Sequence, residues 1–484
     1  MAANASAGAG RWIARWNWAI SRLRLTTGRK AVACWAITRG IIFAFWGLFG
    51  FYPQGDVDYY YRSIRRLFLG LITPEQTLIE YPTPLIWILS LPYLIGAGNK
   101  TGFLFAFIVL FLATDALVAW LLWRTARKFG TDPNPAVLFW IGFVLAMGPI
   151  TYMRLDLLTA ALGAAAVLAL VRGHRASAGV MIGLGASIKL WPALLWPATM
   201  VDRRAVWRAT WGIWSCGAVL VAASLLYAGW DRLLSPLTWQ AGRGLQIESI
   251  YATPIMLARL FAHGHYDVSV SRYQAFEIAG PGSPAMVAVA SAATALGGLT
   301  MLALYLGWLR RHQRTAIEAG TLMIIATLIM IITNKTFSPQ YMMWLAGPVA
   351  GLLTISARRP TMPILPDQPA TPMSLARQIG LWTLALTALT QLVYPTLYGY
   401  LVTWSWLTPL ATVVLAARNL ALLYFSIRLI RLAFRSIAWR PRGEPETPSK
   451  RPLSASPSSP RRPGRITDRA QPASTRPPPL PPAT

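Results

Sequence analysis

Long runs of apolar residues recur along this chain, and they constrain its fold more than any other feature of the sequence. A run of about 18 to 25 apolar residues can cross the hydrocarbon core of a bilayer as a helix, whose backbone satisfies its own hydrogen bonds. With 55% hydrophobic and only 13% charged residues over 484 positions, the composition excludes an ordinary soluble domain. The sequence therefore predicts an all-α polytopic membrane protein with about 10 to 12 transmembrane helices.

Ten segments are predicted to be spans, and they lie near residues 31–51, 101–123, 135–153, 156–171, 208–227, 284–308, 316–333, 341–355, 379–400 and 401–432. Two other apolar segments, 84–98 and 176–200, are short or interrupted by proline and lysine. Because irregular backbone is tolerated at membrane depth only beside protein or water, we expect these two to be broken or re-entrant elements. The pattern predicts one transmembrane domain at residues 31–432.

Two basic segments flank this domain. Residues 1–30 combine arginine and lysine with interleaved tryptophan, which is typical of an interfacial lead-in to a first span rather than of a cleavable signal peptide. Residues 433–484 are rich in proline, serine and arginine and have too little apolar surface to form a core, so we expect a disordered tail. A scaffold that recruits partners through this tail is an alternative function, although the sequence identifies no protein partner.

The distribution of positive charge predicts the orientation. The formal net charge is +28, but the cations lie in short loops and in the two tails rather than on one folded face. This favours anionic membrane lipids over nucleic acid as their partner. Because cytoplasmic loops carry an excess of lysine and arginine, we expect both termini in the cytoplasm, together with the loops near residues 124–128, 172–175, 202–208, 310–314 and 357–360.

Six polar segments then emerge together on the extracytoplasmic side of the cell membrane. They are residues 54–61, 154–156, 189–192, 242–249, 334–341 and 394–398. A membrane protein that gathers carboxylates and cations at one interface is building a reactive or ion-binding site there.

The acidic residues of the first segments are candidates for proton transfer. Asp56 and Asp58 follow the first span, and Glu80 precedes the next apolar segment. A carboxylate at an apolar boundary can act as a general base on a hydroxyl group. Arg154 and Asp156 stand at a junction of two spans, where an ion pair that only holds the helix ends together is an equal alternative.

The cations form a second group of candidates. Lys189 stands inside an apolar stretch, and Arg243 and Lys335 lie in polar segments expected on the same side. An intramembrane ammonium is a functional candidate by default, and three cations on one face would bind a phosphate or pyrophosphate. Each of them could instead anchor the chain at lipid headgroups. The pair His263 and His265 lacks neighbouring carboxylates, so we predict no metal site.

The order of these motifs resembles that of glycosyltransferase family 87, the polyprenyl-phosphate-sugar-dependent transferases of the membrane-embedded C-type superfamily. The matching series is G-D-V-D-Y-Y, E-Y-P-T-P, R-L-D, K-L-W-P, G-R-G-L-Q-I-E-S and N-K-T-F-S-P-Q-Y. The resemblance runs from residue 31 to the last spans, and the family includes mannosyltransferases of lipoglycan assembly. Its usual Y-P-P is Tyr81, Pro82 and Thr83 here, with Pro84 one position late.

The resemblance implies a C-type glycosyltransferase fold with an extracytoplasmic active site. It also implies that the enzyme moves a hexose, with mannose as the leading candidate, from a polyprenyl-phosphate donor to a glycolipid or glycan acceptor with inversion of configuration. The family's D-x-x-x-Y pattern falls on Asp56 and Tyr60, so Asp56 is implied as the general base, with Asp58 in reserve. Four cations, Arg243, Lys335, Lys189 and Arg154, are expected to bind and neutralise the leaving phosphate. We therefore expect no metal or cofactor. The other candidates for substrate binding are Tyr60, Glu80, Tyr81, Asp156, Gln246, Glu248, Asn334, Ser338, Gln340 and Tyr341.

Two alternative interpretations of the same residues stay open. Arabinofuranose is the second candidate sugar, because donors that differ by a few hydroxyl groups use similar pockets. A multi-pass transporter or flippase of lipids or sugars would also contain broken helices and an intramembrane lysine. The polar residues nonetheless gather at one interface instead of near the midplane, and the motifs do not repeat between the two halves, which favours an enzyme.

Overall fold

The structure is a computed structural model of the chain, and it describes residues 25, 27–49, 54–311, 313–356 and 372–438. All of these belong to one compact unit, Met1–Trp439. The second unit, Arg440–Thr484, lies outside the described residues, as does nearly all of the basic N-terminal segment.

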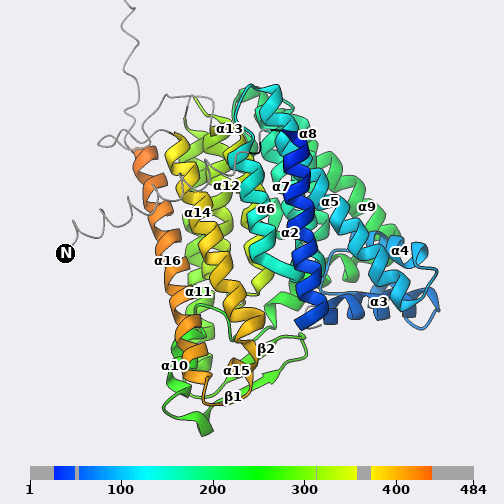
Figure 1. The fold of residues 1–484 in the computed structure, drawn as a ribbon, viewed down its shortest axis with the longest axis vertical. Coiled ribbons are helices and arrows are strands. Elements are labelled where there is room, and N and C mark those ends of the chain that lie inside the picture. Colours follow the sequence, from blue (N-terminus) through cyan, green and yellow to red (C-terminus); the bar gives the residue numbers. More distant parts are fainter. Residues whose placement is uncertain (1–24, 26, 50–53, 312, 357–371, 439–484) are drawn as a thin grey trace, which may run out of the picture. The chain divides into compact units, whose positions relative to one another are not determined.

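Helices dominate the described residues (Figure 1). The longer ones are α2 (Gly28–Phe49), α5 (Lys100–Lys128), α6 (Asn134–Met147), α9 (Arg203–Ala241), α11 (Ser283–Leu309), α12 (Ala316–Thr333), α14 (Pro372–Gln391) and α16 (Thr408–Ala438). The shorter ones are α3 (Gln54–Phe68), α4 (Pro84–Ile95), α7 (Asp156–Val171), α8 (Arg175–Ile188), α10 (Thr253–Arg259), α13 (Met343–Ser356) and α15 (Tyr398–Val402). Between them lie η1 (Pro74–Gln76), η2 (Gly148–Tyr152), η3 (Trp191–Thr199), η4 (His263–His265), η5 (Pro339–Met342) and the π-helical η6 (Leu392–Thr396). The strands β1 (Asp267–Val270) and β2 (Phe276–Ala279) form an antiparallel hairpin.

The prediction of an all-α polytopic membrane protein is confirmed. Among the described residues, seven helical segments are long and apolar enough to cross a membrane, namely α2, α5, α6 with η2, α9, α11, α12 and α16. The remaining predicted spans overlap α7, α13 and α14. Every residue of α13 is buried, so this short helix is surrounded by protein rather than by lipid.

The buried helices approach one another through glycine. A Cβ atom on Gly347 of α13 would lie 1.9 Å from the carbonyl oxygen of Ala160 on α7. A Cβ atom on Gly179 of α8 would lie 2.0 Å from the carbonyl oxygen of Ala209 on α9. In lipid, where helices gain little from hydrophobic association, small residues that let backbones touch supply the packing. Glycine therefore lets α13 approach α7, and α8 approach α9, at backbone contact.

The first polar segment, expected as a loop, is helical. Residues 54–61 form the beginning of α3, which lies across the direction of the long helices (Figure 1). Val57, Tyr60 and Ile64 are buried along one face of α3, at the spacing of a helical stripe. Its charged residues lower the local hydropathy, and this is why a search for apolar runs does not detect the helix.

The two segments expected to be broken or re-entrant differ from each other. The segment 176–200 is interrupted as expected, because α8 ends at Ile188 and Lys189 has extended backbone (φ −144°, ψ 135°). Arg175 before the break donates from Nε to Asp202 Oδ2 at 2.7 Å, so this segment goes out and returns to the same end. In the segment 84–98, α4 (Pro84–Ile95) is a continuous helix with Pro92 inside it, so this segment is short but not broken.

The spans near the C-terminus are displaced from the predicted boundaries. The segment expected at 379–400 leaves helical geometry at Tyr394 (φ −130°, ψ 124°), one residue before Pro395, because a residue that precedes proline disfavours helical backbone. The last helix, α16, begins at Thr408 and continues to Ala438. The break at Tyr394 turns this part of the chain toward the polar end of the bundle.

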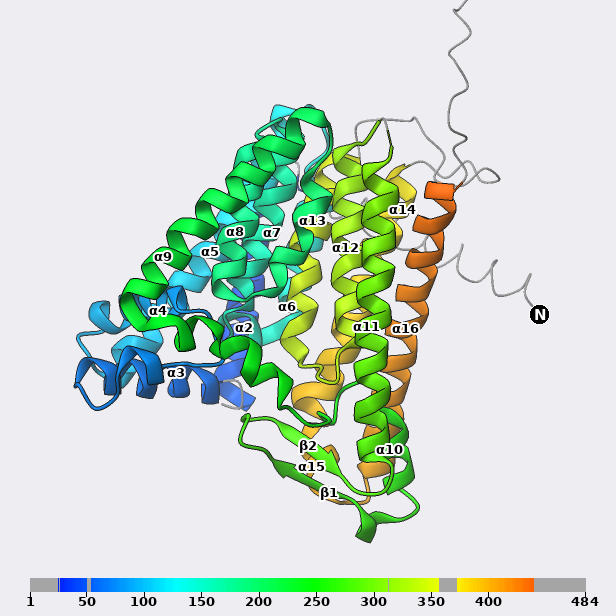
Figure 2. The same cartoon turned by 180° about the vertical axis from the view of Figure 1, so that it is seen from behind.

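The polar segments and the basic loops lie at opposite ends of the bundle. Figures 1 and 2 show α3, α10, α15 and the hairpin at one end. At the other end, Arg311 Nη2 lies 2.7 Å from Glu318 Oε1, and Arg175 pairs with Asp202. Each end therefore collects its own set of charged residues, as the sequence pattern predicts.

We expect Gly347→Ala to destabilise the fold, because its Cβ would meet the backbone of Ala160 at 1.9 Å and a backbone carbonyl cannot easily move aside. Overpacking of this kind costs about 1 to 3 kcal/mol. Thermal unfolding of the purified protein in detergent measures the effect. Gly298→Ala is the matched control, because a Cβ there has nothing within 4 Å; equal melting temperatures for the two variants would contradict the packing.

Candidate functional site

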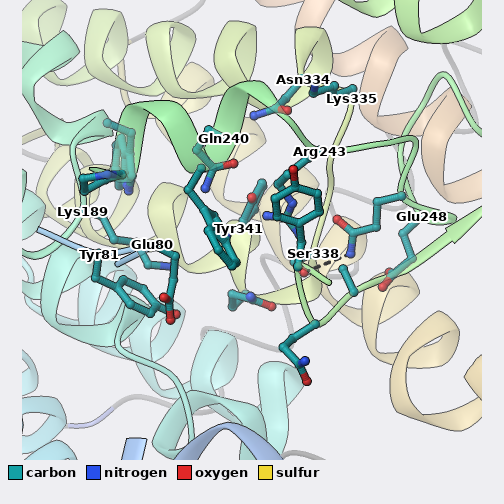
Figure 3. A pocket seen from close by; sticks show the side chains of 18 of the residues that line it. Glu80, Tyr81, Lys189, Gln240, Arg243, Glu248, Asn334, Lys335, Ser338 and Tyr341 are labelled. Atoms are coloured by element: carbon teal, nitrogen blue, oxygen red, sulfur yellow. Dashed lines mark hydrogen bonds between the residues drawn. The ribbon is translucent and has the colours of Figure 1, made fainter. Parts of the chain in front are cut away.

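A cavity of about 950 Å³ lies at the end of the bundle that holds α3 and the hairpin. Its walls come from α3, η3, the end of α9, α11 and the loops around residues 80–82, 243–248, 272–276 and 334–341. All of the predicted site residues line it except Asp58 and Asp156. Figure 3 shows many of these side chains, with Lys189, Glu80 and Tyr81 on one side of the view and Glu248 on the other.

Asp56 faces the cavity from the first turn of α3. Its carboxylate pairs with the guanidinium of Arg154, which precedes α7. The Asp56 side chain is 28% exposed, so the carboxylate is accessible from the cavity. This ion pair joins α3 to the connection between α6 and α7.

Asp58 points away from the cavity. Its Oδ2 accepts a hydrogen bond from Lys100 Nζ at 2.8 Å, and the Lys100 side chain is 54% exposed. Residues two positions apart on a helix do not share a face. Of the two aspartates that the sequence singles out, only Asp56 lines the cavity.

Lys189 and Asp156 form a pair at the wall of the cavity. Lys189 Nζ donates to both oxygens of Asp156, at 2.8 and 2.9 Å. Trp344 Nε1 donates to Asp156 Oδ1 at 2.5 Å. The ammonium also lies 5.7 Å from the centroid of Tyr81. Asp156 is therefore behind the wall, where it neutralises Lys189. The sequence suggested an ion pair of Arg154 with Asp156, but in the structure Arg154 pairs with Asp56 and Asp156 pairs with Lys189.

Arg243 and Lys335 bring positive charge to another part of the cavity. Partial burial lowers the pKa of the Lys335 ammonium, Glu277 opposes this shift and the like charge of Arg243 adds to it. Arg243 and Lys335 both line the cavity. Charge-assisted hydrogen bonds from two such cations suit a phosphate group.

The turn that carries Glu80 is held by a buried arginine, Arg232, that the sequence did not single out. Burial raises the pKa of the Glu80 carboxyl, whereas Tyr59, Arg232 and Arg243 lower it. Arg232, on α9 beyond the kink at Gly229, donates from Nη1 to the Tyr81 carbonyl oxygen at 2.8 Å. Arg232 fixes the turn that carries Glu80 and Tyr81.

The two glycines of the G-R-G motif let the hairpin approach. A Cβ on Gly242 would lie 2.2 Å from Tyr273 Oη, and a Cβ on Gly244 would lie 2.4 Å from Glu277 Oε2. The segment after the motif pairs with β2, because Ile278 N donates to the Leu245 carbonyl oxygen at 2.9 Å. Larger residues at either glycine would displace the hairpin side chains that flank Arg243.

An aromatic column forms a third wall. Trp191 and Trp344 stack with ring centroids 4.8 Å apart, and Trp344 stacks on Tyr341 at 3.9 Å. All three line the cavity, as does Trp239, whereas the Tyr251 hydroxyl is bonded to the Ile332 carbonyl oxygen at 3.1 Å. Flat aromatic faces of this kind suit sugar rings or prenyl chains.

Glu248 lies at the floor of the cavity beside Arg418, a second buried arginine that the sequence did not single out. Arg418 Nη2 lies 3.5 Å from Glu248 Oε2, and the two side chains are 0% and 1% exposed. Burial raises the pKa of the Glu248 carboxyl to about 7, although Arg418 and Arg154 oppose the shift. An arginine inside a long apolar run was the available signal for Arg418, because intramembrane charges are rare.

The other polar candidates lie together. Gln246 Nε2 donates to Ser338 Oγ at 3.2 Å, and Gln246 N donates to the Lys335 carbonyl oxygen at 3.3 Å. Asn334 and Gln340 line the same wall, and Tyr60 bonds Tyr81 through their hydroxyl groups at 3.0 Å. The site therefore combines the partly exposed carboxylate of Asp56 with several cations and aromatic faces.

Comparison with known proteins adds one finding. The sequence profile of glycosyltransferase family 87 matches residues 81–339, which is more than half of the chain. The matched region contains Arg154, Lys189, Arg243 and Lys335 and begins downstream of Asp56. No curated protein matches the chain.

Loss of Asp156 alone should destabilise the protein strongly. Asp156→Leu leaves the Lys189 ammonium without its carboxylate, and breaking a buried pair costs about 3 to 5 kcal/mol. The double variant with Lys189→Met removes both charges and should recover much of the loss. Thermal unfolding in detergent compares them, with Asp58→Asn as the control for an exposed pair. A double variant no more stable than Asp156→Leu would disprove the role of charge pairing.

The stability of the protein should depend on pH through Glu248. The pKa of this carboxyl is raised from 4.5 to about 7 in the folded state, so the folded protein keeps a proton that the unfolded chain has lost between these values. Stability relative to Glu248→Gln should therefore fall as pH rises from about 4.5 to about 7 and then stay level. Melting temperatures of the two proteins across this range measure it, and a constant difference would show that Glu248 titrates normally.

Proposed function

Since the chain belongs to glycosyltransferase family 87, we propose that this membrane glycosyltransferase moves a hexose from a polyprenyl-phosphate donor to a glycolipid or glycan acceptor outside the cytoplasm. Mannose is the favoured hexose. The observation that carries the proposal is the single cavity lined by Asp56, by Arg243 and Lys335 and by the stacked rings of Tyr341 and Trp344. The broken helices also suggested a transporter or flippase, but we favour transfer over transport because the family is one of glycosyltransferases.

A lateral opening supports a lipid-linked donor. The cavity is lined by Leu237 at the end of α9 and by Ser291 and Thr294 of α11, and all three side chains are exposed. Because α11 is one of the apolar segments long enough to span the membrane, this side of the cavity opens toward lipid. A prenyl chain could stay in the bilayer there while its phosphate reaches the cations.

The basic loops at the opposite end of the bundle support an extracytoplasmic site. If lysine and arginine face the cytoplasm, the cavity opens on the other side, where the donor must be a lipid carrier that has crossed the membrane. Both chain termini are proposed to lie in the cytoplasm on the same ground.

The proposed reaction is an in-line displacement. Asp56 accepts the proton of an acceptor hydroxyl while that oxygen forms a bond to the anomeric carbon. The bond from this carbon to the phosphate oxygen breaks on the other side, so the configuration inverts and polyprenyl phosphate leaves. Arg243 and Lys335 stabilise the charge that develops on the leaving phosphate.

The ion pair of Asp56 with Arg154 has a consequence for this step. A carboxylate paired with a guanidinium is a weaker base, because protonation would forfeit the attraction. We infer that Arg154 turns toward the donor phosphate when the donor binds, which leaves Asp56 free to accept a proton. Arg154 then serves both the resting carboxylate and the leaving group.

The proposal predicts that Asp56→Asn loses transfer activity. General base catalysis contributes about 100-fold or more to rate, so kcat should fall by at least that factor. The assay follows transfer from a short-chain polyprenyl-phosphate mannose to octyl α-mannopyranoside by the purified protein. Asp58→Asn is the matched control, because Asp58 lies on the other face of α3; full activity in Asp56→Asn would exclude Asp56 as the base.

A further inference from the structure

The β1–β2 hairpin carries residues at its tip that the catalytic proposal does not use. The strands pair in register from Asp267 with Ala279 to Val270 with Phe276. Beyond them the tip closes where Ser271 N donates to the Ala275 carbonyl oxygen at 2.9 Å. Arg272, Tyr273 and Gln274 at this tip line the cavity.

Tyr273 is held in place on several sides. Its ring lies edge-on to Trp239, with centroids 5.0 Å apart. Two guanidinium groups flank the ring, with Arg272 Cζ at 4.8 Å and Arg243 Cζ at 6.0 Å from its centroid. Arg272 Nη2 donates to the Tyr273 hydroxyl at 2.6 Å. These contacts fix an aromatic ring at the cavity wall without burying it completely.

We propose that Trp239 and the hairpin tip form a subsite that binds a sugar ring of the acceptor. The subsite combines two aromatic rings, which suit the apolar face of a pyranose, with the donors of Arg272 and the side-chain amides of Gln240 and Gln274, which suit its hydroxyl groups. This inference rests on the proposed function, because it assigns one of the two substrates of that reaction.

The position of the subsite favours the acceptor over the donor. Arg272 and Gln274 are exposed, and the hairpin lies at the end of the bundle, beyond the long helices (Figure 2). The donor's prenyl chain needs the lateral opening beside α11, within the apolar part of the molecule. A glycan that arrives from water instead meets the hairpin tip first.

The experiment compares Tyr273→Ala with Tyr273→Phe in the purified full chain. With octyl α-mannopyranoside as acceptor, Tyr273→Ala should raise the acceptor KM about tenfold, equivalent to about 1.4 kcal/mol of binding free energy. The donor KM should rise much less than the acceptor KM, because Tyr273 contacts the donor-binding Arg243 only at 6.0 Å. Tyr273→Phe keeps the ring and should keep the acceptor KM close to that of the wild type.

A glycine pair provides variants that leave Tyr273 in the chain. Gly242→Ala places a Cβ 2.2 Å from the Tyr273 hydroxyl, which must move, whereas a Cβ on Gly264 has nothing within 4 Å. Gly242→Ala should raise the acceptor KM, and Gly264→Ala should not. An unchanged acceptor KM in Tyr273→Ala, or a donor KM raised as much as the acceptor KM, would overturn the subsite.

A binding measurement separates this inference from the proposed function. Saturation-transfer NMR with methyl α-mannopyranoside reports contact of the sugar with aromatic protons and needs no turnover. The signal should be present in the wild type and in Tyr273→Phe and absent in Tyr273→Ala. If the wild type transfers no sugar from polyprenyl phosphate, the proposed function fails; if the NMR signal is equal in all three proteins, the subsite fails.

Discussion

Buried charges in this protein are tied to partners, and much of the architecture follows from that constraint. Moving an unpaired ion out of water costs several kcal/mol even after relaxation, so Lys189 can occupy the break after α8 only because Asp156 meets it at 2.8 Å. The same requirement acts deeper in the bundle. There, Asp115 on α5 is 0% exposed and accepts hydrogen bonds from Arg39 of α2, Trp140 of α6 and Tyr152 of η2.

These pairs act as connections between helices. The Asp115 cluster joins α2, α5, α6 and η2, and it fixes Tyr152 two residues before Arg154. Arg154 in turn reaches Asp56 on α3. A chain of polar contacts therefore runs from the interior of the bundle to the cavity, and it holds the candidate base against a rigid body rather than on an independent loop.

The cavity exists because several elements stop being regular at the same end of the bundle. α8 ends before Lys189, α9 bends at Gly229 (φ 70°) and the helical path after α14 is interrupted at Tyr394. Each break frees backbone groups that lipid could not satisfy, and Lys189 and Tyr394 at two of these breaks line the cavity. Glycines at 242 and 244 then bring the hairpin against Arg243. The breaks that make room for substrate thus also deliver the side chains that would contact it.

The sequence by itself determined the membrane class, the helical spans and the set of polar segments. Hydropathy and charge bias follow from the residue types along the chain and need no knowledge of distant contacts. It also singled out Asp56, Lys189, Arg243 and Lys335, whose charge stands out against apolar surroundings. Only the tertiary structure decided that Asp58 faces Lys100 and that Asp156 sits behind Lys189. It also decided that Arg232 and Arg418 contact residues of the cavity wall and that Tyr273 lines the cavity. Those outcomes depend on helix phase, on the bend of α9 and on contacts between segments more than 100 residues apart, such as Arg418 with Glu248, and no local pattern encodes which distant side chains will meet.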